Sequence, residues 1–175
     1  MTKNMRIKQI SVVMENIPGK LSGLSDVLGA EGINIRAITV ADTSDLTTVR
    51  MIVDDPAKAI LVLESKGYNI RQREVLAVET PDHPGGLNAV LRPLRDAQIN
   101  VHYLYPYIGR IKDNAILILG VDKIDEALAI LSDRFESKNE DDLTEQLPGA
   151  RNPLPASFKI QPDDLDNLAS VRAAL

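Results

Sequence analysis

The fold is decided by a segment that occurs twice, first as Ile17-Pro18-Gly19-Lys20-Leu21 and again, 66 positions later, as His83-Pro84-Gly85-Gly86-Leu87. At the same offset, Ile33-Asn34-Ile35 falls on Ile99-Asn100-Val101. After a slip of two residues, the apolar positions of a later segment also agree. Several motifs that share one offset indicate an internal repeat, so the chain contains two copies of one unit.

The first copy shows a regular order of elements. Alternating apolar residues at 10, 12 and 14 predict a strand, and apolar residues at helical spacing over 21–28 predict a helix. Asp55 before Pro56 predicts a helix start, with an N-cap followed by proline. The expected elements are a strand at 10–14, a helix at 21–28, strands at 33–40 and 49–53, a helix from 56 up to Gly67, and a strand at 70–78.

The second copy repeats this order, with a strand at 75–79, a helix at 87–97, strands at 101–107 and 115–121, and a helix at 124–135. Pro93 removes a hydrogen bond inside the first of these helices, so a kink or an irregular first turn is expected there. The order βαββαβ predicts an α+β, ferredoxin-like unit with both helices on one face. Because edge strands must be paired or covered, we expect the copies to join in one longer antiparallel sheet of about eight strands.

These patterns divide the chain into three parts. The two copies occupy residues 1–72 and 73–136. Residues 137–175 form an acidic, proline-containing tail, which either docks as a strand or short helix or remains a mobile linker.

Composition excludes several classes of function. The chain has 175 residues, of which 44% are hydrophobic and only 3% aromatic, so its core is aliphatic. The formal net charge of −5 argues against binding to nucleic acid or an anionic membrane, because both need a basic surface. The absence of cysteine excludes disulfides and thiolate zinc sites. No apolar stretch approaches the roughly 20 residues of a membrane helix and no signal peptide is expected, so a cytoplasmic protein is predicted.

The two glycine turns can be interpreted as ligand sites or as plain connections. Glycine allows a ligand close to the backbone, and the free N–H groups of a helix's first turn bind anions such as a carboxylate. Pro and Gly are equally common in ordinary turns. Asn34 and Asn100 open the second strand of each copy, where we expect them near the turn. Their amides can contact an ammonium or a carboxylate group, although Asn is also a common turn residue.

Histidines and tyrosines add two weaker signals. His83 and His102 have no obvious third ligand beside them, so no metal site is expected. His83 is either an exposed turn residue or a contact for a ligand carboxylate. The tyrosines at 103, 105 and 107 alternate and therefore point to one side of their strand. Because Pro106 lies between them, an edge or interface position is expected, with the rings packed against a partner or capping a ligand.

The whole pattern resembles the ACT-domain family, in particular small stand-alone proteins with two ACT domains in tandem. The resemblance covers residues 7–135 and rests on residues 16–21, 32–35, 53–56, 68–70, 74–78 and 81–87. It implies that an amino acid binds between neighbouring ACT units, with its carboxylate at the loop before the first helix and its amino group at the asparagine position. The implied ligand-binding residues are Asn16, Pro18, Gly19, Lys20, Leu21 and Asn34 in one copy, and Asp82, Pro84, Gly85, Gly86, Leu87 and Asn100 in the other.

The residues favour a regulatory module over an enzyme. No convincing nucleophile and base, carboxylate pair or metal cluster is present. An RNA-binding ferredoxin-like domain would carry aromatic residues on its central strands, and residues 10–14 and 49–53 have none. Together with this exclusion, the resemblance to ACT domains implies a sensor without catalytic activity or cofactor that binds an amino acid, branched-chain or otherwise apolar. It would act as a homodimer on a partner enzyme or transporter. The alternative is a ligand-free ACT oligomerisation or scaffold module that acts on a partner enzyme.

Overall fold

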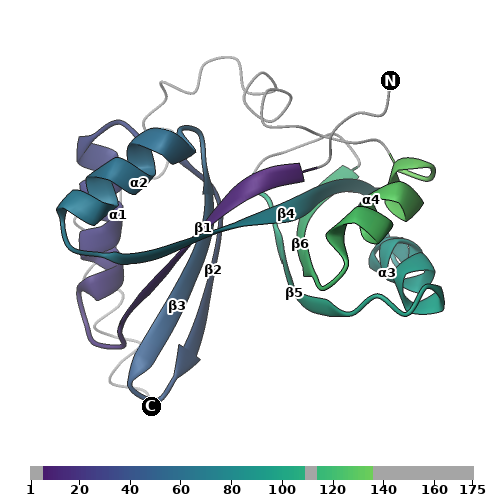
Figure 1. Cartoon of the computed structure of the whole chain (residues 1–175), viewed down its shortest axis with the longest axis horizontal. Helices are drawn as coiled ribbons and strands as arrows, with labels where there is room; N and C mark the ends of the chain where they lie inside the picture. The colour runs from purple at the N-terminus through teal and green to yellow at the C-terminus, as the bar shows by residue number, and fades with distance from the viewer. Residues whose placement is uncertain (1–5, 109–113, 136–175) are drawn as a thin grey trace, which may run out of the picture. The chain divides into compact units, whose positions relative to one another are not determined.

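The computed structural model describes residues 6–108 and 114–135. The described residues form β1 (Arg6–Glu15), α1 (Lys20–Ala30), β2 (Ile35–Thr43), β3 (Leu46–Val53), α2 (Pro56–Ser65), β4 (Asn69–Pro81), α3 (Gly86–Asp96), β5 (Val101–Pro106), β6 (Asn114–Val121) and α4 (Ile124–Ser132). This is the predicted α+β order (Figure 1). The predicted tail lies outside the described residues. None of the described helices has the length and apolar character needed to cross a membrane.

Helix boundaries follow the local signals. Asp55 is the N-cap of α2, and its side chain accepts a hydrogen bond from the N–H of Lys58 at 2.9 Å. Pro56 lies in the first turn, where the N–H that proline lacks would have no helical partner. Pro93 does not end α3, which continues to Asp96. The predicted start of α2 is therefore confirmed, and α3 accommodates its proline.

The six strands belong to one antiparallel sheet in the order β2-β3-β1-β4-β6-β5. Strand β4 belongs to both copies, because its residues 69–76 pair with β1 and its residues 76–81 pair with β6. The expectation of about eight strands is therefore wrong for the described residues. One long strand closes the first copy and opens the second, and the boundary expected between residues 72 and 73 falls inside it.

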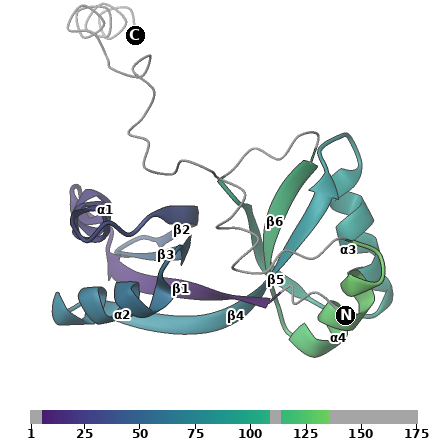
Figure 2. The same cartoon turned by 90° about the horizontal axis from the view of Figure 1, so that it is seen from above.

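All four helices cover the same face of the sheet, as predicted. Ile70 of β4 packs into the core beneath α1 and α2, whereas Leu76 and Val78 pack into the core beneath α3 and α4. These three positions lie an even number of residues apart, and alternate residues of a strand share a face. The helices form two pairs, α1 with α2 and α3 with α4, over the two ends of the sheet (Figures 1 and 2).

The helix-free face has a core of its own that joins the two copies. It contains Ile7, Ala37, Ile52, Val75, Ala77, Tyr105, Tyr107, Ile116 and Ile118. The sheet curves so that its edge strands approach each other, and the N–H of Ile108 donates to the carbonyl of Arg36 at 2.7 Å. The edge position predicted for residues 101–107 is confirmed. Two of the three tyrosines are buried here against the other copy of the same chain.

Polar contacts also cross this face. Gln9 of β1 is 1% exposed. The hydroxyl of Tyr105 donates to Gln9 Oε1 at 2.9 Å, and Gln9 Nε2 donates to the hydroxyl of Tyr103 at 3.0 Å. The guanidinium of Arg50 lies 4.5 Å from the centre of the Tyr103 ring, a cation–π geometry. These contacts join β1 and β3 of the first copy to β5 of the second.

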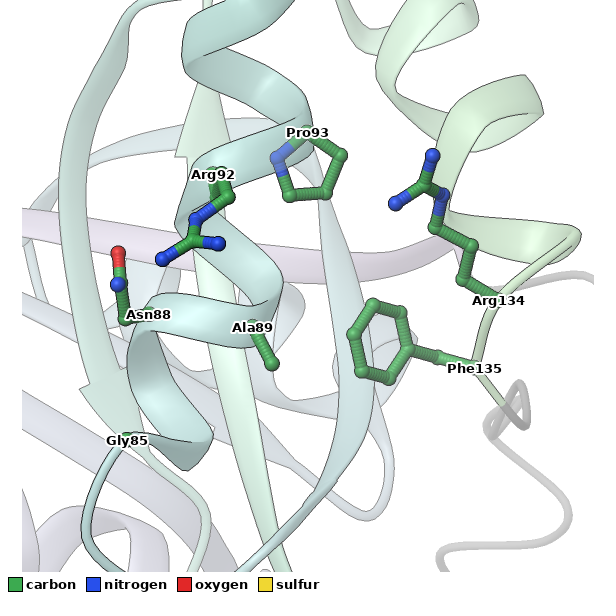
Figure 3. A pocket seen from close by; sticks show the side chains of 7 residues that line it. All are labelled: Gly85, Asn88, Ala89, Arg92, Pro93, Arg134 and Phe135. Carbon is green, nitrogen blue, oxygen red and sulfur yellow. The ribbon is translucent and has the colours of Figure 1, made fainter.

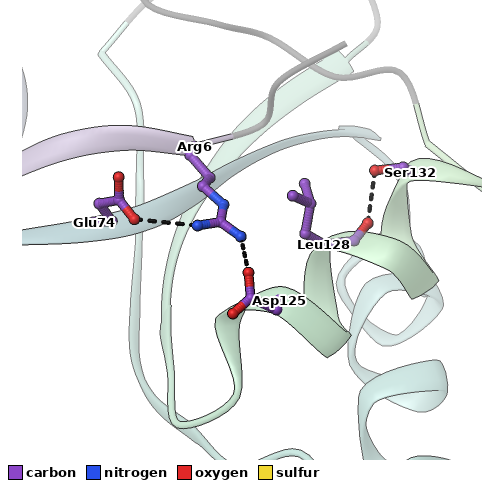
Figure 4. Close-up of polar contacts among 5 residues, drawn as sticks. All are labelled: Arg6, Glu74, Asp125, Leu128 and Ser132. Atoms are coloured by element: carbon purple, nitrogen blue, oxygen red, sulfur yellow. Dashed lines mark hydrogen bonds and ion pairs between the residues drawn. The ribbon is translucent and has the colours of Figure 1, made fainter. Parts of the chain in front are cut away.

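Arg6 makes a further link between the copies (Figure 4). Its guanidinium donates to Glu74 of β4 at 3.3 Å and to Asp125 in the first turn of α4. The hydrogen bond to Asp125 raises the pKa of Arg6. A carboxylate in the first turn of a helix also interacts favourably with the helix dipole. Strand β1 of the first copy is therefore tied to helix α4 of the second.

Candidate functional site

The first predicted site lies in the turn between β1 and α1. Gly19 is the N-cap of α1, with a φ of +87° that glycine adopts without strain. No side chain caps this helix, and the first N–H groups of a helix have no acceptor within it. The N–H of Asn16 donates to the carbonyl of Asp45 at 3.0 Å and anchors the turn to the β2–β3 hairpin. The first turn of α1 therefore has N–H groups that can donate hydrogen bonds to an anion.

The second predicted site repeats this geometry with one difference. Gly85 is the N-cap of α3, with a φ of +95° and again no side-chain cap. A Cβ on Gly86 would lie 2.1 Å from the carbonyl oxygen of Pro81, so a larger residue requires the backbone to move. The hydroxyl of Thr80 donates to the carbonyl of Gly86 at 3.1 Å and closes the turn. Packing within the turn thus accounts for glycine where the first copy has Lys20.

Lys20 forms an ion pair with Glu15 at the end of β1, with Nζ 2.8 Å from Oε2. This hydrogen bond lowers the pKa of Glu15 and raises the pKa of Lys20. Both side chains are exposed, so water and salt screen the pair. The contact holds a cation beside the N-terminus of α1, the end of the helix that attracts negative charge.

Asn34 and Asn100 are held by aspartates at equivalent positions. The N–H of Asn34 donates to the carboxylate of Asp54 at 2.9 Å, and the N–H of Asn100 donates to the carboxylate of Asp122 at 3.0 Å. Each aspartate N–H donates in return to the carbonyl of its asparagine. Both asparagine side chains are exposed. Asp54 and Asp122 were not identified as site residues from the sequence. Their equivalent positions, directly after the third strand of each copy, could have indicated a shared role.

The expectation that each asparagine lies beside the turn of its own copy is wrong. Helix α1 separates Gly19 from Asn34 and has 11 residues, a length of about 16 Å at 1.5 Å per residue. The turn at residues 16–19 meets the β2–β3 hairpin at Asp45, whereas Asn34 precedes the opposite end of β2. Proximity along the chain was misleading, because the intervening helix runs along the length of the sheet.

Parts of the two copies meet at the end of the sheet that holds Asn34. The turn of the second copy follows Pro81, which pairs with Asn114 of β6. Strand β5 lies next to β6. The segment after β5 reaches Arg36, two residues from Asn34, through the N–H of Ile108. The second turn and Asn34 therefore lie at the same end of the sheet, on different copies.

Arg36 is a buried cation at this end of the sheet that the sequence patterns did not reveal. It is 6% exposed, its Nη2 lies 3.9 Å from the carboxylate of Asp54, and its Nε has no hydrogen-bond partner among the described residues. Burial raises the pKa of Tyr107, while Arg36 acts in the opposite direction. A buried charge requires a partner, so Asp54 serves both Arg36 and the N–H of Asn34. In the sequence, a buried cation was indicated only by the presence of one charged residue within the otherwise apolar segment 35–38.

The histidines lie on the surface. His83 is exposed in the second turn, with Nδ1 2.9 Å from the carbonyl oxygen of Pro84. His102 is exposed on β5. Within residues 6–108 and 114–135, no group of three or more His, Asp or Glu side chains could hold a metal ion.

Known proteins show the same architecture. Protein BT0572 from Bacteroides thetaiotaomicron is 28% identical, with a TM-score of 0.74 over 79% of this chain and 96% of that chain. The ligand-free regulatory subunit of aspartate kinase from Thermus thermophilus is 16% identical, with a TM-score of 0.54 over 74% of this chain and 93% of that chain. The corresponding subunit from Thermus flavus is 15% identical, with a TM-score of 0.52 over 76% and 98%. The last two similarities show the fold alone.

No curated protein matches the sequence. The family model described as an ACT domain pair matches residues 5–147, which include both copies and the strand that they share. The chain therefore belongs to the ACT domain pair family.

Proposed function

We propose that this protein is a regulatory sensor that binds a small amino acid between ACT units and does not catalyse a reaction. The observation that carries the proposal is the pair of helix N-termini at Gly19 and Gly85, each formed by a left-handed glycine and each without a side-chain cap. Free N–H groups at such a position bind a carboxylate. Similarity in fold to the regulatory subunit of aspartate kinase is consistent with regulation.

The proposed site combines elements of two units. The amino-acid carboxylate binds at the turn of one unit, and its ammonium group contacts the asparagine of the facing unit. The turn residues are Asn16, Pro18, Gly19, Lys20 and Leu21, or Asp82, Pro84, Gly85, Gly86 and Leu87. The asparagine contacts are Asn34, which lies at the same end of the sheet as the second turn, and Asn100. Leu21 and Leu87 are large apolar residues exposed at these turns. They favour a branched-chain or other apolar amino acid as the ligand.

Regulation requires that the ligand binds one arrangement of the ACT units more tightly than another. A ligand shifts a conformational balance only when it binds one state more tightly than another. In the proposed mechanism, residues 1–72 and 73–136 are the two ACT units of each chain, two chains form a homodimer in the cytoplasm, and residues 137–175 act as a docking tail. A partner enzyme or transporter responds to the arrangement that the ligand favours. No nucleic acid, membrane or cofactor takes part.

A ligand-free oligomerisation module is the second candidate. Ile17, Leu21 and Leu46 are large apolar residues that are 54%, 43% and 48% exposed. The hydrogen bond between Asn16 and Asp45 brings the turn and the hairpin that carry them together. Neighbouring exposed apolar residues favour contact with another protein surface.

Thermal unfolding in the presence of each of the twenty amino acids tests the sensor function. A ligand at about 100 times its dissociation constant contributes about 2.7 kcal/mol, which raises the unfolding midpoint. We expect one amino acid, or one related group, to raise the midpoint of the wild type. Asn34→Ala and Asn100→Ala should lose part or all of this response. Asn69→Ala, on the exposed part of β4, is the matched control.

The two candidate functions give different results in this experiment. All three asparagines keep their backbone hydrogen bonds as alanine, so the variants should fold. If no amino acid raises the midpoint of a folded, oligomeric wild type, the scaffold function replaces the sensor function. If Asn69→Ala loses the response as fully as the other two variants, the assignment of Asn34 and Asn100 is wrong.

A further inference from the structure

A pocket of about 470 Å³ lies between α3 and the residues that follow α4 (Figure 3). This volume falls within the range of small-molecule sites. One face of α3 supplies Asn88, Ala89, Arg92 and Pro93, and the segment after α4 supplies Arg134 and Phe135. Residues three and four apart on a helix share a face, so α3 lines the pocket over more than one turn.

Two guanidinium groups, those of Arg92 and Arg134, line this pocket. Among the described residues, the side chains of Arg92 and Arg134 have no ion-pair or hydrogen-bond partner. Arg95, further along α3, differs because Asp96 binds its guanidinium at 2.6 Å. Figure 3 shows the head group of Arg134 turned towards α3 and Pro93. Two cations that line one pocket, with no counter-ion among the described residues, attract an anion even in a chain whose net charge is −5.

The rest of the pocket is mostly apolar. Pro93 is buried and Phe135 is half-buried, and both contribute to the lining together with Ala89. Asn88 adds an amide that can donate or accept a hydrogen bond. The pocket therefore combines a cationic side with an apolar surface, which suits an organic anion better than a bare inorganic ion.

The corresponding place in the first copy is different. Asp26 stands at the position equivalent to Arg92, and Lys66 and Gly67 stand at those equivalent to Arg134 and Phe135. The hydroxyl of Tyr68 lies 3.9 Å from where a Cβ on Gly23 would be, so this ring covers the position equivalent to Ala89. The cationic pocket is thus specific to the second copy and does not follow from the duplicated fold.

We propose that the pocket binds a small organic anion whose carboxylate or phosphate group is held by Arg92 and Arg134. The apolar part of the ligand lies on Pro93 and Phe135. The planar donor groups of arginine match the oxygens of both kinds of anion. The pocket shares only Gly85 with the proposed amino-acid site and includes neither Asn34 nor Asn100. The two proposals can therefore fail independently.

Isothermal titration of the full chain with phenyl phosphate and with benzoate tests this proposal. Each probe joins an oxyanion to an apolar ring. We expect the wild type to bind at least one of them, and Arg92→Gln and Arg134→Gln each to weaken binding roughly tenfold or more, because each removes a charge-assisted hydrogen bond. Arg95→Gln is the matched control and should bind as the wild type does. Binding of phenyl phosphate alone assigns a phosphate ligand, and binding of benzoate alone assigns a carboxylate.

Two results would overturn the proposal. One is a wild type that binds neither probe. The other is an equal loss of affinity in all three arginine variants, which would show a general charge effect instead of a pocket. The three side chains are exposed, and an unchanged thermal midpoint for each variant verifies that the fold is intact.

Discussion

The carboxylate of Asp54 accepts the backbone N–H of Asn34 at 2.9 Å, so the residue after β3 fixes the residue before β2. The second copy repeats this contact between Asp122 and Asn100 at 3.0 Å. Backbone N–H groups at the end of a strand need a partner when the ladder stops, and here a side chain provides it. The side chains of Asn34 and Asn100 therefore start from equivalent places in the two copies, as the proposed ligand contact requires.

Removal of these acceptors should destabilise each copy. We expect Asp122→Ala to lower the free energy of unfolding by about 1 kcal/mol, because it leaves a backbone N–H without its acceptor. Asp54→Ala should lower it by more, because it also removes the ion-pair partner of the buried Arg36. The sites lie in different copies, so the double variant should show roughly the sum. Urea denaturation measures the effect. Asp26→Ala, exposed on α1, is the control and should not lower stability; a loss as large as the others would contradict the assignment.

The hydrogen bond between Tyr105 and Gln9 should contribute measurably to stability. Tyr105→Phe leaves Oε1 of Gln9 buried without its donor, so we expect a loss of about 1–2 kcal/mol in the free energy of unfolding. Tyr103→Phe should cost less, because Gln9 Nε2 also donates to the hydroxyl of Ser11 at 3.1 Å. Urea denaturation of both variants gives the comparison. The reverse order would show that the Tyr105 contact does not join the copies in this way.

Alkaline pH should weaken the fold through the same residue. Burial raises the pKa of Tyr105 above the ordinary value of about 10, and the neighbouring Tyr103 adds to this effect. A group with a raised folded-state pKa contributes stability that is complete below its unfolded pKa and is lost as the pH rises above it. The free energy of unfolding should therefore fall above about pH 10, and less steeply in Tyr105→Phe. Urea denaturation over a pH series measures both slopes, and equal slopes would contradict the prediction.

The elements of the fold could be predicted because their signals are local. The alternation of Ile10, Val12 and Met14 puts all three in the buried face of β1, and the pair Asp55-Pro56 starts α2. Because the sequence repeats, the same elements could be predicted at the equivalent positions of the second copy. Glycines at equivalent turns likewise indicated where the two uncapped helix N-termini lie.

The arrangement of the copies could not be predicted in this way, since it depends on contacts between distant residues. Residues 69–80 read as extended whether two strands meet edge to edge or one strand serves both copies. The inward packing of Tyr105 depends on the curvature of the sheet, which no short motif encodes. The pocket of Arg92 and Arg134 depends on how the end of α4 lies against α3. These features required the tertiary structure.

An added methyl group would collide with the backbone at Gly86 but would have free space at Gly29. We expect Gly86→Ala to lower the free energy of unfolding by about 1–3 kcal/mol, because the new Cβ would lie 2.1 Å from a backbone oxygen of Pro81. Gly29→Ala is the matched change in α1, where an added Cβ meets nothing within 4 Å. It should raise stability by about 0.5–1 kcal/mol, since alanine is favoured over glycine within a helix. Thermal and urea unfolding of the two variants should therefore move in opposite directions. A Gly86→Ala variant as stable as the wild type would mean that the second turn does not pack against Pro81, and the explanation for glycine at the position equivalent to Lys20 would then be lost.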